Sequence, residues 1–150
     1  MLYFREFELK ENDQDNIEKR IRSLSKRRHS SLDIVQSVSY DRDGKLFLAV
    51  ETSENITLTR LKLPIERFLP KIIVRFSKSD FRYYKIRLSL FSSIIFVLLW
   101  IPVFSGIQGI SQNKIQASDL IVFFCLLMGF VLLAIIEIAL TKRKLKNLEK

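Results

Sequence analysis

The distribution of apolar residues divides the chain into two unlike parts. Two long apolar runs, Leu88 to Phe104 and Leu120 to Leu140, follow a more mixed segment. Each run is close to the roughly 20 residues that a helix rising about 1.5 Å per residue needs to cross about 30 Å of hydrocarbon. The pattern therefore predicts a two-helix transmembrane hairpin over residues 82–140. Its spans are expected at about 87–107 and 119–140, with a connection from Ser105 to Asp119.

The positions of the cations predict how this hairpin is oriented. Basic residues precede the first run and follow the second run. The connection between the runs holds only Lys114 and Asp119 as charged residues. Lys and Arg in short flanks favour the cytoplasmic side. We therefore expect an integral membrane protein of the cell inner membrane with both termini cytoplasmic. The residues expected to set this topology are Arg82, Lys85, Arg87, Lys142, Arg143 and Lys144.

Residues 1–81 have the mixed pattern of a small cytoplasmic domain. Partial alternation and aromatic residues predict a strand from Leu2 to Leu9. The spacing of Ile17, Ile21 and Leu24 predicts a narrow amphipathic helix over Asp13–His29. Acidic residues open this helix and basic residues close it, an order that complements the helix dipole.

A β-meander is predicted after this basic helix. Asp33–Tyr40 and Lys45–Glu51 flank an Asp-Gly dipeptide, which is typical of a hairpin because Gly44 can take a positive φ. Ile56–Leu63 supplies a third strand, with a bulge near Thr59–Arg60 where the apolar phase changes.

The segment between the meander and the first span is harder to assign. Lys71–Phe76 is apolar enough for a further hairpin strand or for a membrane-surface segment. Ser77–Tyr84 is expected to be a polar and aromatic link, with Tyr83 and Tyr84 at the inner membrane boundary. The predicted fold class is α+β. A small N-terminal cytoplasmic domain of strand, basic helix and antiparallel β-meander precedes the hairpin, and a basic cytoplasmic tail, 141–150, follows it.

Charge and composition narrow the possible functions. The net charge of +9 is explained by cytoplasmic flanks that face anionic headgroups, so we expect no nucleic-acid binding. The single His, His29, and the single Cys, Cys125, cannot form a Cys/His metal site, and four glycines allow no glycine-rich phosphate loop. We predict no catalytic, cofactor-binding or metal-binding residues and a protein that is not an enzyme.

One carboxylate lies in the last third of the second run. Glu137 either reaches the interface, pairing with Lys142 or a neighbouring cation, or faces a lumen or a subunit interface. Small residues in both runs permit close helix approach, either within one hairpin or between copies. The candidate membrane and oligomer contacts are Ser89, Ser93, Gly129, Ala134 and Glu137.

Two functions of different classes fit these features. The first is a non-enzymatic two-pass membrane subunit, an adaptor that anchors and oligomerises in the lipid bilayer through its hairpin. In a homo-oligomer or larger membrane complex, its N-terminal domain would dock a cytoplasmic protein partner that the sequence does not identify. The alternative is a ligand-responsive, membrane-perturbing or channel-like effector. Polar residues in the runs are too few for a wide aqueous path, which favours the first function.

Overall fold

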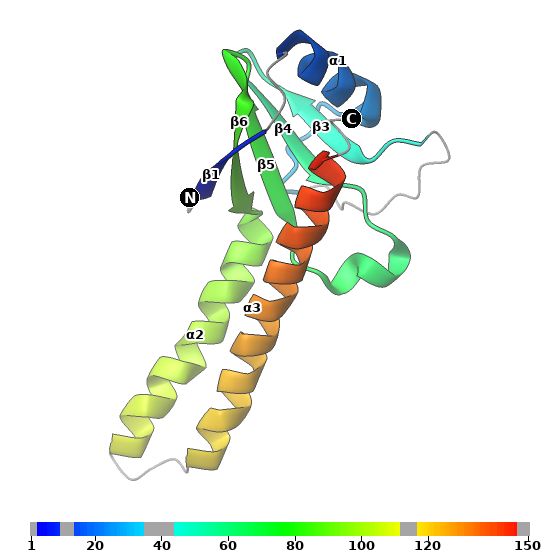
Figure 1. Cartoon of the computed structure of the whole chain (residues 1–150). Helices are drawn as coiled ribbons and strands as arrows, with labels where there is room; N and C mark the ends of the chain where they lie inside the picture. Colours follow the sequence, from blue (N-terminus) through cyan, green and yellow to red (C-terminus); the bar gives the residue numbers. More distant parts are fainter. Residues whose placement is uncertain (1–2, 10–13, 35–43, 112–116, 147–150) are drawn as a thin grey trace.

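The computed structural model describes residues 3–9, 14–34, 44–111 and 117–146. It has an α+β fold in which two long helices project from a six-stranded sheet (Figure 1). The described elements, in chain order, are β1 (Tyr3–Glu8), α1 (Gln14–Leu24), β2 (Ser25–Arg27), β3 (Phe47–Glu51), β4 (Asn55–Arg60), the 3₁₀ helix η1 (Pro64–Phe68), β5 (Ile72–Ser77), β6 (Asp80–Leu88), α2 (Leu90–Ser111) and α3 (Ala117–Leu145).

The sheet has the strand order β1-β6-β5-β4-β3-β2. Strands β3 to β6 form an antiparallel meander, which confirms the strands predicted at Lys45–Glu51 and Ile56–Leu63. Asp33 and Ile34, the start of the first predicted strand, lie instead in a turn, and the apolar segment Lys71–Phe76 contributes to the hairpin strand β5. Strand β1 pairs antiparallel with β6, whereas β2 pairs parallel with β3. The sheet is therefore mixed, and its two edges are formed by its first two strands.

The predicted helix over Asp13–His29 is too long. Helix α1 ends at Leu24, and the next three residues form β2, whose Ser25 lies opposite Phe47 of β3. The basic residues of β2 fit the last turn of a helix as well as an edge strand, so the local pattern misassigns them. Gly44 has the positive φ expected of it, 71°, but residues 35–43 of the predicted hairpin lie outside the described residues.

Two further predictions in the meander are wrong. The register between β3 and β4 is regular through the pair Phe47 and Arg60, so no bulge interrupts it. The apolar phase changes because both sheet faces are buried. The expected link Ser77–Tyr84 instead forms the turn between β5 and β6 and the first half of β6. Tyr84 packs in the core at 6% exposure rather than at a membrane boundary.

Apolar side chains cover both faces of the sheet. The larger cluster combines β-strand residues such as Leu58 and Phe76 with Ile17 and Ile21 of α1 and Leu145 of α3. A smaller cluster on the opposite face holds Leu32, Leu48, Leu61 and Ile73. Burial on both faces explains why the central strands read as continuous apolar runs. The first part of the predicted basic tail, 141–150, thus packs on the sheet, because Leu145 in that segment is only 1% exposed.

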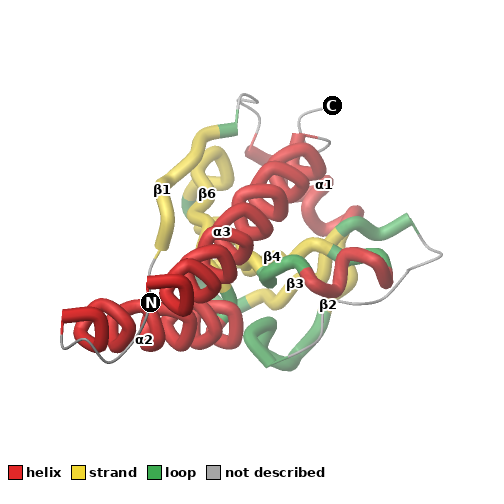
Figure 2. The backbone as a smooth tube through the Cα atoms, turned by 90° about the horizontal axis from the view of Figure 1, so that it is seen from below, coloured by secondary structure: helices red, strands yellow, loops and turns green. Residues whose placement is uncertain are grey.

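The long helices pair with each other and differ in length. Helix α2 is about 33 Å long and α3 about 44 Å, at about 1.5 Å per residue. The extra length lies on the sheet: in Figure 2, which views the molecule from below, α3 crosses the strands and ends near α1. The expected connection from Ser105 to Asp119 is mostly helical, since α2 continues to Ser111 and α3 starts at Ala117.

Candidate functional site at the junction of the sheet and the long helices

A buried ion pair joins the sheet to α3. Arg60 is the last residue of β4, and its Nε and Nη2 donate to the two carboxylate oxygens of Glu137 at 3.1 and 2.6 Å. The two side chains are 2% and 1% exposed. They lie 77 positions apart in the sequence. Glu137 is therefore paired with a neighbouring cation, as one interpretation expects, but that cation comes from the sheet rather than from Lys142.

Glu66 occupies the other side of the Arg60 guanidinium. Nη1 of Arg60 donates to both oxygens of Glu66, at 2.9 and 2.8 Å. Glu66 also accepts a hydrogen bond from the backbone N–H of Leu63 at 2.9 Å, and Pro64 occupies the first position of η1. These contacts stabilise the start of η1, where a carboxylate and a proline are both favourable. Arg60 consequently holds η1 and α3 together.

Lys62 is the second buried cation of this cluster. Its Nζ lies 3.7 Å from Oε1 of Glu137 and donates to the carbonyls of Leu69 and Pro70 at 2.7 and 3.1 Å. Burial lowers the pKa of Lys62 despite the attraction of Glu137. Burial also disfavours the charged form of Arg60, but its hydrogen bonds to Glu137 and Glu66 outweigh this and raise its pKa. The network therefore keeps its guanidinium charged.

Helix α2 is attached to the sheet by a different set of contacts. Ser89 is its N-cap: the Ser89 hydroxyl accepts from the N–H of Ser92 at 3.3 Å, and the Ser89 carbonyl accepts from Ser93 at 2.9 Å. Ser92 Oγ in turn accepts from the backbone N–H of Lys71 at 2.9 Å. A serine at this position satisfies amides that the first turn of a helix leaves open.

Asp33 completes the attachment of α2. Its carboxylate accepts from both terminal nitrogens of Arg87, at 2.9 and 2.8 Å, and from the backbone N–H of Leu90 at 2.8 Å. The hydrogen bonds from Arg87 lower the pKa of Asp33, although partial burial opposes the shift. A carboxylate at the first turn of a helix also interacts favourably with the helix dipole.

The structure places the predicted small contact residues in different settings. Ser89 is fully buried within this chain and is not available to a second copy, whereas Ser93, Gly129 and Ala134 are partly exposed. A Cβ on Gly129 would have no atom within 4 Å, so Gly129 is not a close contact of this hairpin. The close approach is at Gly106, where a Cβ would lie 2.5 Å from Cδ1 of Leu120.

The cations predicted to set topology do not lie in unstructured segments beside the two long helices. They lie on strand β6 and in the last turn of α3. Arg82, Lys85 and Arg87 lie on β6, and Arg87 is 8% exposed because it binds Asp33. Lys142 Nζ lies 3.6 Å from the ring centroid of Phe7, a cation–π contact with β1. The remaining cations are Arg143, which is exposed, and Lys144, whose Nζ donates to the carbonyl of Leu61 at 3.4 Å. Their effect on topology stays a prediction.

Sequence reasoning did not identify Arg60, Glu66 or Asp33, which appear along the chain as ordinary surface charges. One signal was available for the packing of α3. Ile138, Thr141 and Leu145 are spaced i, i+3 and i+7, and they continue an apolar stripe through the charged end of the helix. That stripe predicts a helix end that lies on a protein surface.

The chemistry of this junction is that of closed ion pairs. Each carboxylate at the junction, Glu137, Glu66 and Asp33, is held by arginine hydrogen bonds. Among the described residues, no group of three or more His, Cys, Asp or Glu side chains is arranged to hold a metal ion. The arrangement holds elements together. No protein-family model, no curated protein and no solved structure matches this chain.

Proposed function

We propose that this chain is a non-enzymatic two-pass membrane subunit, in which α2 and α3 anchor the sheet domain and hold it in a fixed position at the membrane surface. The single observation that carries the proposal is the buried pair of Arg60 and Glu137, which ties the end of the sheet to the second long helix. In this arrangement the sheet domain docks a cytoplasmic partner, and the partly exposed helix faces contact further copies.

Membrane insertion is supported by the length, composition and exposure of the two helices. Leu90–Gly109 and Leu120–Leu145 are long and apolar enough to cross a bilayer. Their large apolar side chains are mostly exposed, for example Phe91 at 67% and Ile121 at 62%. A helix in the core of a water-soluble protein buries such side chains, and apolar patches of this extent mark contact with lipid or protein.

The contacts between the sheet and the long helices support a sheet domain that is held rigidly on α2 and α3 rather than joined to them by a flexible linker. Helix α2 follows β6 with one intervening residue, Ser89, and α3 lies across the sheet through Ile138 and Leu145. Because Arg60 and Asp33 each bind two elements, rotation of the domain against either helix breaks several hydrogen bonds at once. A rigid attachment of this kind is expected of a subunit whose sheet domain presents a binding surface at a fixed distance from the bilayer.

The channel-like effector is less well supported. That function places Glu137 near the inner mouth of a conducting path, where its carboxylate would face water or ions. Glu137 is instead 1% exposed and hydrogen-bonded to Arg60. The burial of this charge favours the anchoring subunit, and a reproducible single-channel current from the wild-type protein in bilayers would favour the effector.

The first experiment tests insertion and topology. In a Cys125→Ala background, a cysteine replaces either Ser111, at the end of α2, or Ser53, in the turn between β3 and β4. We expect an impermeant thiol reagent to label the first variant from outside intact cells and to label the second only after lysis. Reversed labelling, or release of the protein by alkaline carbonate, would contradict the anchoring function.

A second experiment tests self-association through the helices. Gly129→Leu adds a bulky side chain to a helix face that is open in the single chain, and Val122→Leu is a control at an exposed position. If copies meet at Gly129, only the first variant lowers the oligomeric state measured by light scattering in detergent. An unchanged mass would remove Gly129 from the interface.

A further inference from the structure

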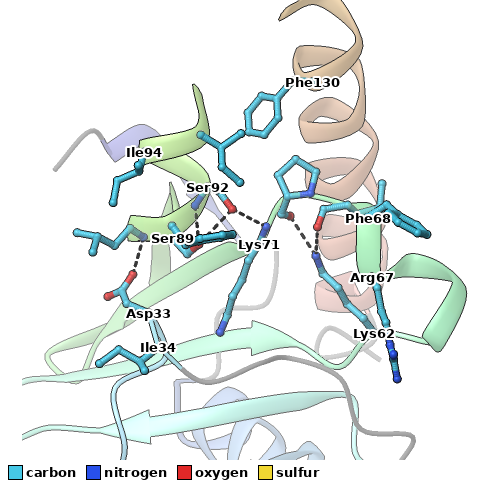
Figure 3. Close-up of a pocket in the computed structure, with 15 residues that line it drawn as sticks. Asp33, Ile34, Lys62, Arg67, Phe68, Lys71, Ser89, Ser92, Ile94 and Phe130 are labelled. Atoms are coloured by element: carbon cyan, nitrogen blue, oxygen red, sulfur yellow. Dashed lines mark hydrogen bonds between the residues drawn. The ribbon is translucent and has the colours of Figure 1, made fainter. Parts of the chain in front are cut away.

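A cavity of about 690 Å³ lies where α2 leaves the sheet. Its walls come from the turn at Asp33 and Ile34, from η1 and the segment after it, from the first turns of α2, and from Phe130 of α3. In Figure 3, Lys71, Ser89 and Ser92 form the centre of the wall, with Asp33 and Ile34 on one side and Lys62, Arg67 and Phe68 on the other. The cavity therefore lies at the boundary between the sheet domain and the two apolar helices, and residues of both line it.

The end of the cavity at the sheet is positively charged. Lys62, Arg67 and Lys71 line it, against one carboxylate, Asp33. Asp33 is already neutralised by its ion pair with Arg87, as Lys62 is by Glu137, so the charge excess rests on Arg67 and Lys71. Arg67 is exposed, and no carboxylate among the described residues lies within ion-pair distance of it. Burial lowers the pKa of Lys71 to about 8, so a nearby anion would stabilise its charged form at neutral pH.

The opposite end of the cavity is apolar, and its lining includes the exposed side chains Phe91 and Ile94 of α2. Phe91, Ile94 and Ile95 contribute the first turns of α2, and Phe130 stacks on Phe96 at 5.9 Å between ring centroids. Ile95 lies about 7 to 8 Å along the axis of α2 from its start. Phe68, at the rim of the cavity on η1, is 86% exposed, and Ile65 beside it is 88% exposed. These side chains suit hydrocarbon rather than water.

We propose that this cavity binds one anionic glycerophospholipid, with its headgroup at the end lined by Arg67 and Lys71 and an acyl chain along Ile94, Ile95 and Phe130. The proposal rests on insertion of the two helices into a bilayer, because only then does the apolar end meet acyl chains. The charge excess selects an anionic headgroup over a zwitterionic one, since the headgroup supplies the negative charge that the cavity lacks. The apolar wall distinguishes a lipid from a free phosphate compound.

The test of headgroup binding uses the full chain purified in detergent. Dioleoyl phosphatidylglycerol or dioleoyl phosphatidylcholine is added, and retained lipid is measured by native mass spectrometry. We expect one phosphatidylglycerol to be retained in clear preference to phosphatidylcholine. Arg67→Gln and Lys71→Gln should each lower its retention about five-fold, the effect of losing one cation near an anionic headgroup. Arg143→Gln removes an exposed cation outside the cavity and should leave retention unchanged. Equal retention of the two lipids, or an equal effect of Arg143→Gln, would overturn the proposal.

A second pair of variants tests the apolar end. Ile94→Trp fills the cavity without changing its charge, and Ile107→Trp adds the same side chain to an exposed position farther along α2. Only the first should reduce retention of phosphatidylglycerol. Glycerol phosphate, which carries the phosphate without acyl chains, should fail to displace the lipid. Displacement by glycerol phosphate would identify a soluble phosphate site instead. Carbonate extraction of each variant reports insertion separately, so loss of the lipid site is distinguishable from loss of the anchoring function.

Discussion

The two long helices meet the sheet in opposite ways. Helix α2 follows β6 along the chain, and its first turn is capped by Ser89 and Asp33. Helix α3 enters from the far end of the hairpin and has no strand beside it in the sequence. It is held instead by the ion pair of Glu137 with Arg60 and by Leu145 in the core. One attachment is therefore largely local, whereas the other depends on contacts between residues far apart in the sequence.

The comparison of the two attachments shows under which condition a charged side chain can be buried at this junction. Removing Arg and Glu side chains from water is expensive, and their attraction offsets the expense only with good geometry and further hydrogen bonds. Arg60 meets this condition because both sides of its guanidinium are bound. At the start of α2 the groups that need partners are backbone amides, which carry no charge of their own. Ser89 and Asp33 bind these amides, so fewer charged groups are fully buried there than at Glu137.

The largest expected effect comes from breaking the attachment of α3. Glu137→Gln leaves Arg60 buried without its full partner, so the free energy of unfolding in detergent should fall by about 3 to 5 kcal/mol. Circular dichroism during denaturation measures this loss. Combining Glu137→Leu with Arg60→Met removes both charges of the pair but leaves the buried Lys62 without Glu137, so it should recover only part of the loss. A loss below about 1 kcal/mol for Glu137→Gln, the value of an exposed ion pair, would contradict the buried attachment.

The attachment of α2 should be weaker and sensitive to acid. Asp33→Asn loses its charged hydrogen bonds to Arg87 and should lower the free energy of unfolding by about 2 kcal/mol. Because the folded-state pKa of Asp33 is lowered, its contribution is complete above the ordinary aspartate pKa and is lost as the pH falls below about 4. Denaturation at pH 7 and pH 3 should show a smaller gap between variant and wild type at pH 3. A gap that widens in acid would contradict this role.

A bulky substitution should destabilise the pair of long helices at Gly106 but not at Gly129. Gly106→Leu forces a side chain against Leu120, and overpacking of this kind costs about 1 to 3 kcal/mol. A Cβ at Gly129 meets no atom within 4 Å, so Gly129→Leu should leave the stability of the single chain nearly unchanged. Thermal unfolding of the two variants in detergent makes the comparison. Equal destabilisation would show that the helices pair through a different face.

The smallest effect is expected at the C-terminal end of α3, which lies on the sheet. Lys142→Met keeps the length and apolar stem of the side chain but removes the cation above the ring of Phe7. Such contacts contribute about 0.5 to 1 kcal/mol at exposed sites, so the change in unfolding free energy should be of that size. The same denaturation assay measures it. A loss comparable to that of Glu137→Gln would move the main attachment of α3 from Arg60 to β1.

Local pattern by itself determined a large part of this structure. The two apolar runs predicted two long helices because their length and composition leave few other ways to satisfy the backbone. The runs that follow the Asp-Gly dipeptide and that start at Ile56 predicted strands β3 and β4, and the spacing of Ile17 and Ile21 predicted the buried face of α1. These features depend on neighbours within a few residues, which a sequence displays directly.

The tertiary structure alone decided which charges are buried and which end of α3 packs on the sheet. Arg60 and Glu137 are ordinary charged residues in the sequence, and only the fold brings them within 2.6 Å of each other. The short strand β2 and the buried Leu145 depend in the same way on partners that lie far along the chain. A parallel pairing of three residues and a long-range ion pair leave no periodic signal, because their energy comes from contacts that local spacing does not encode.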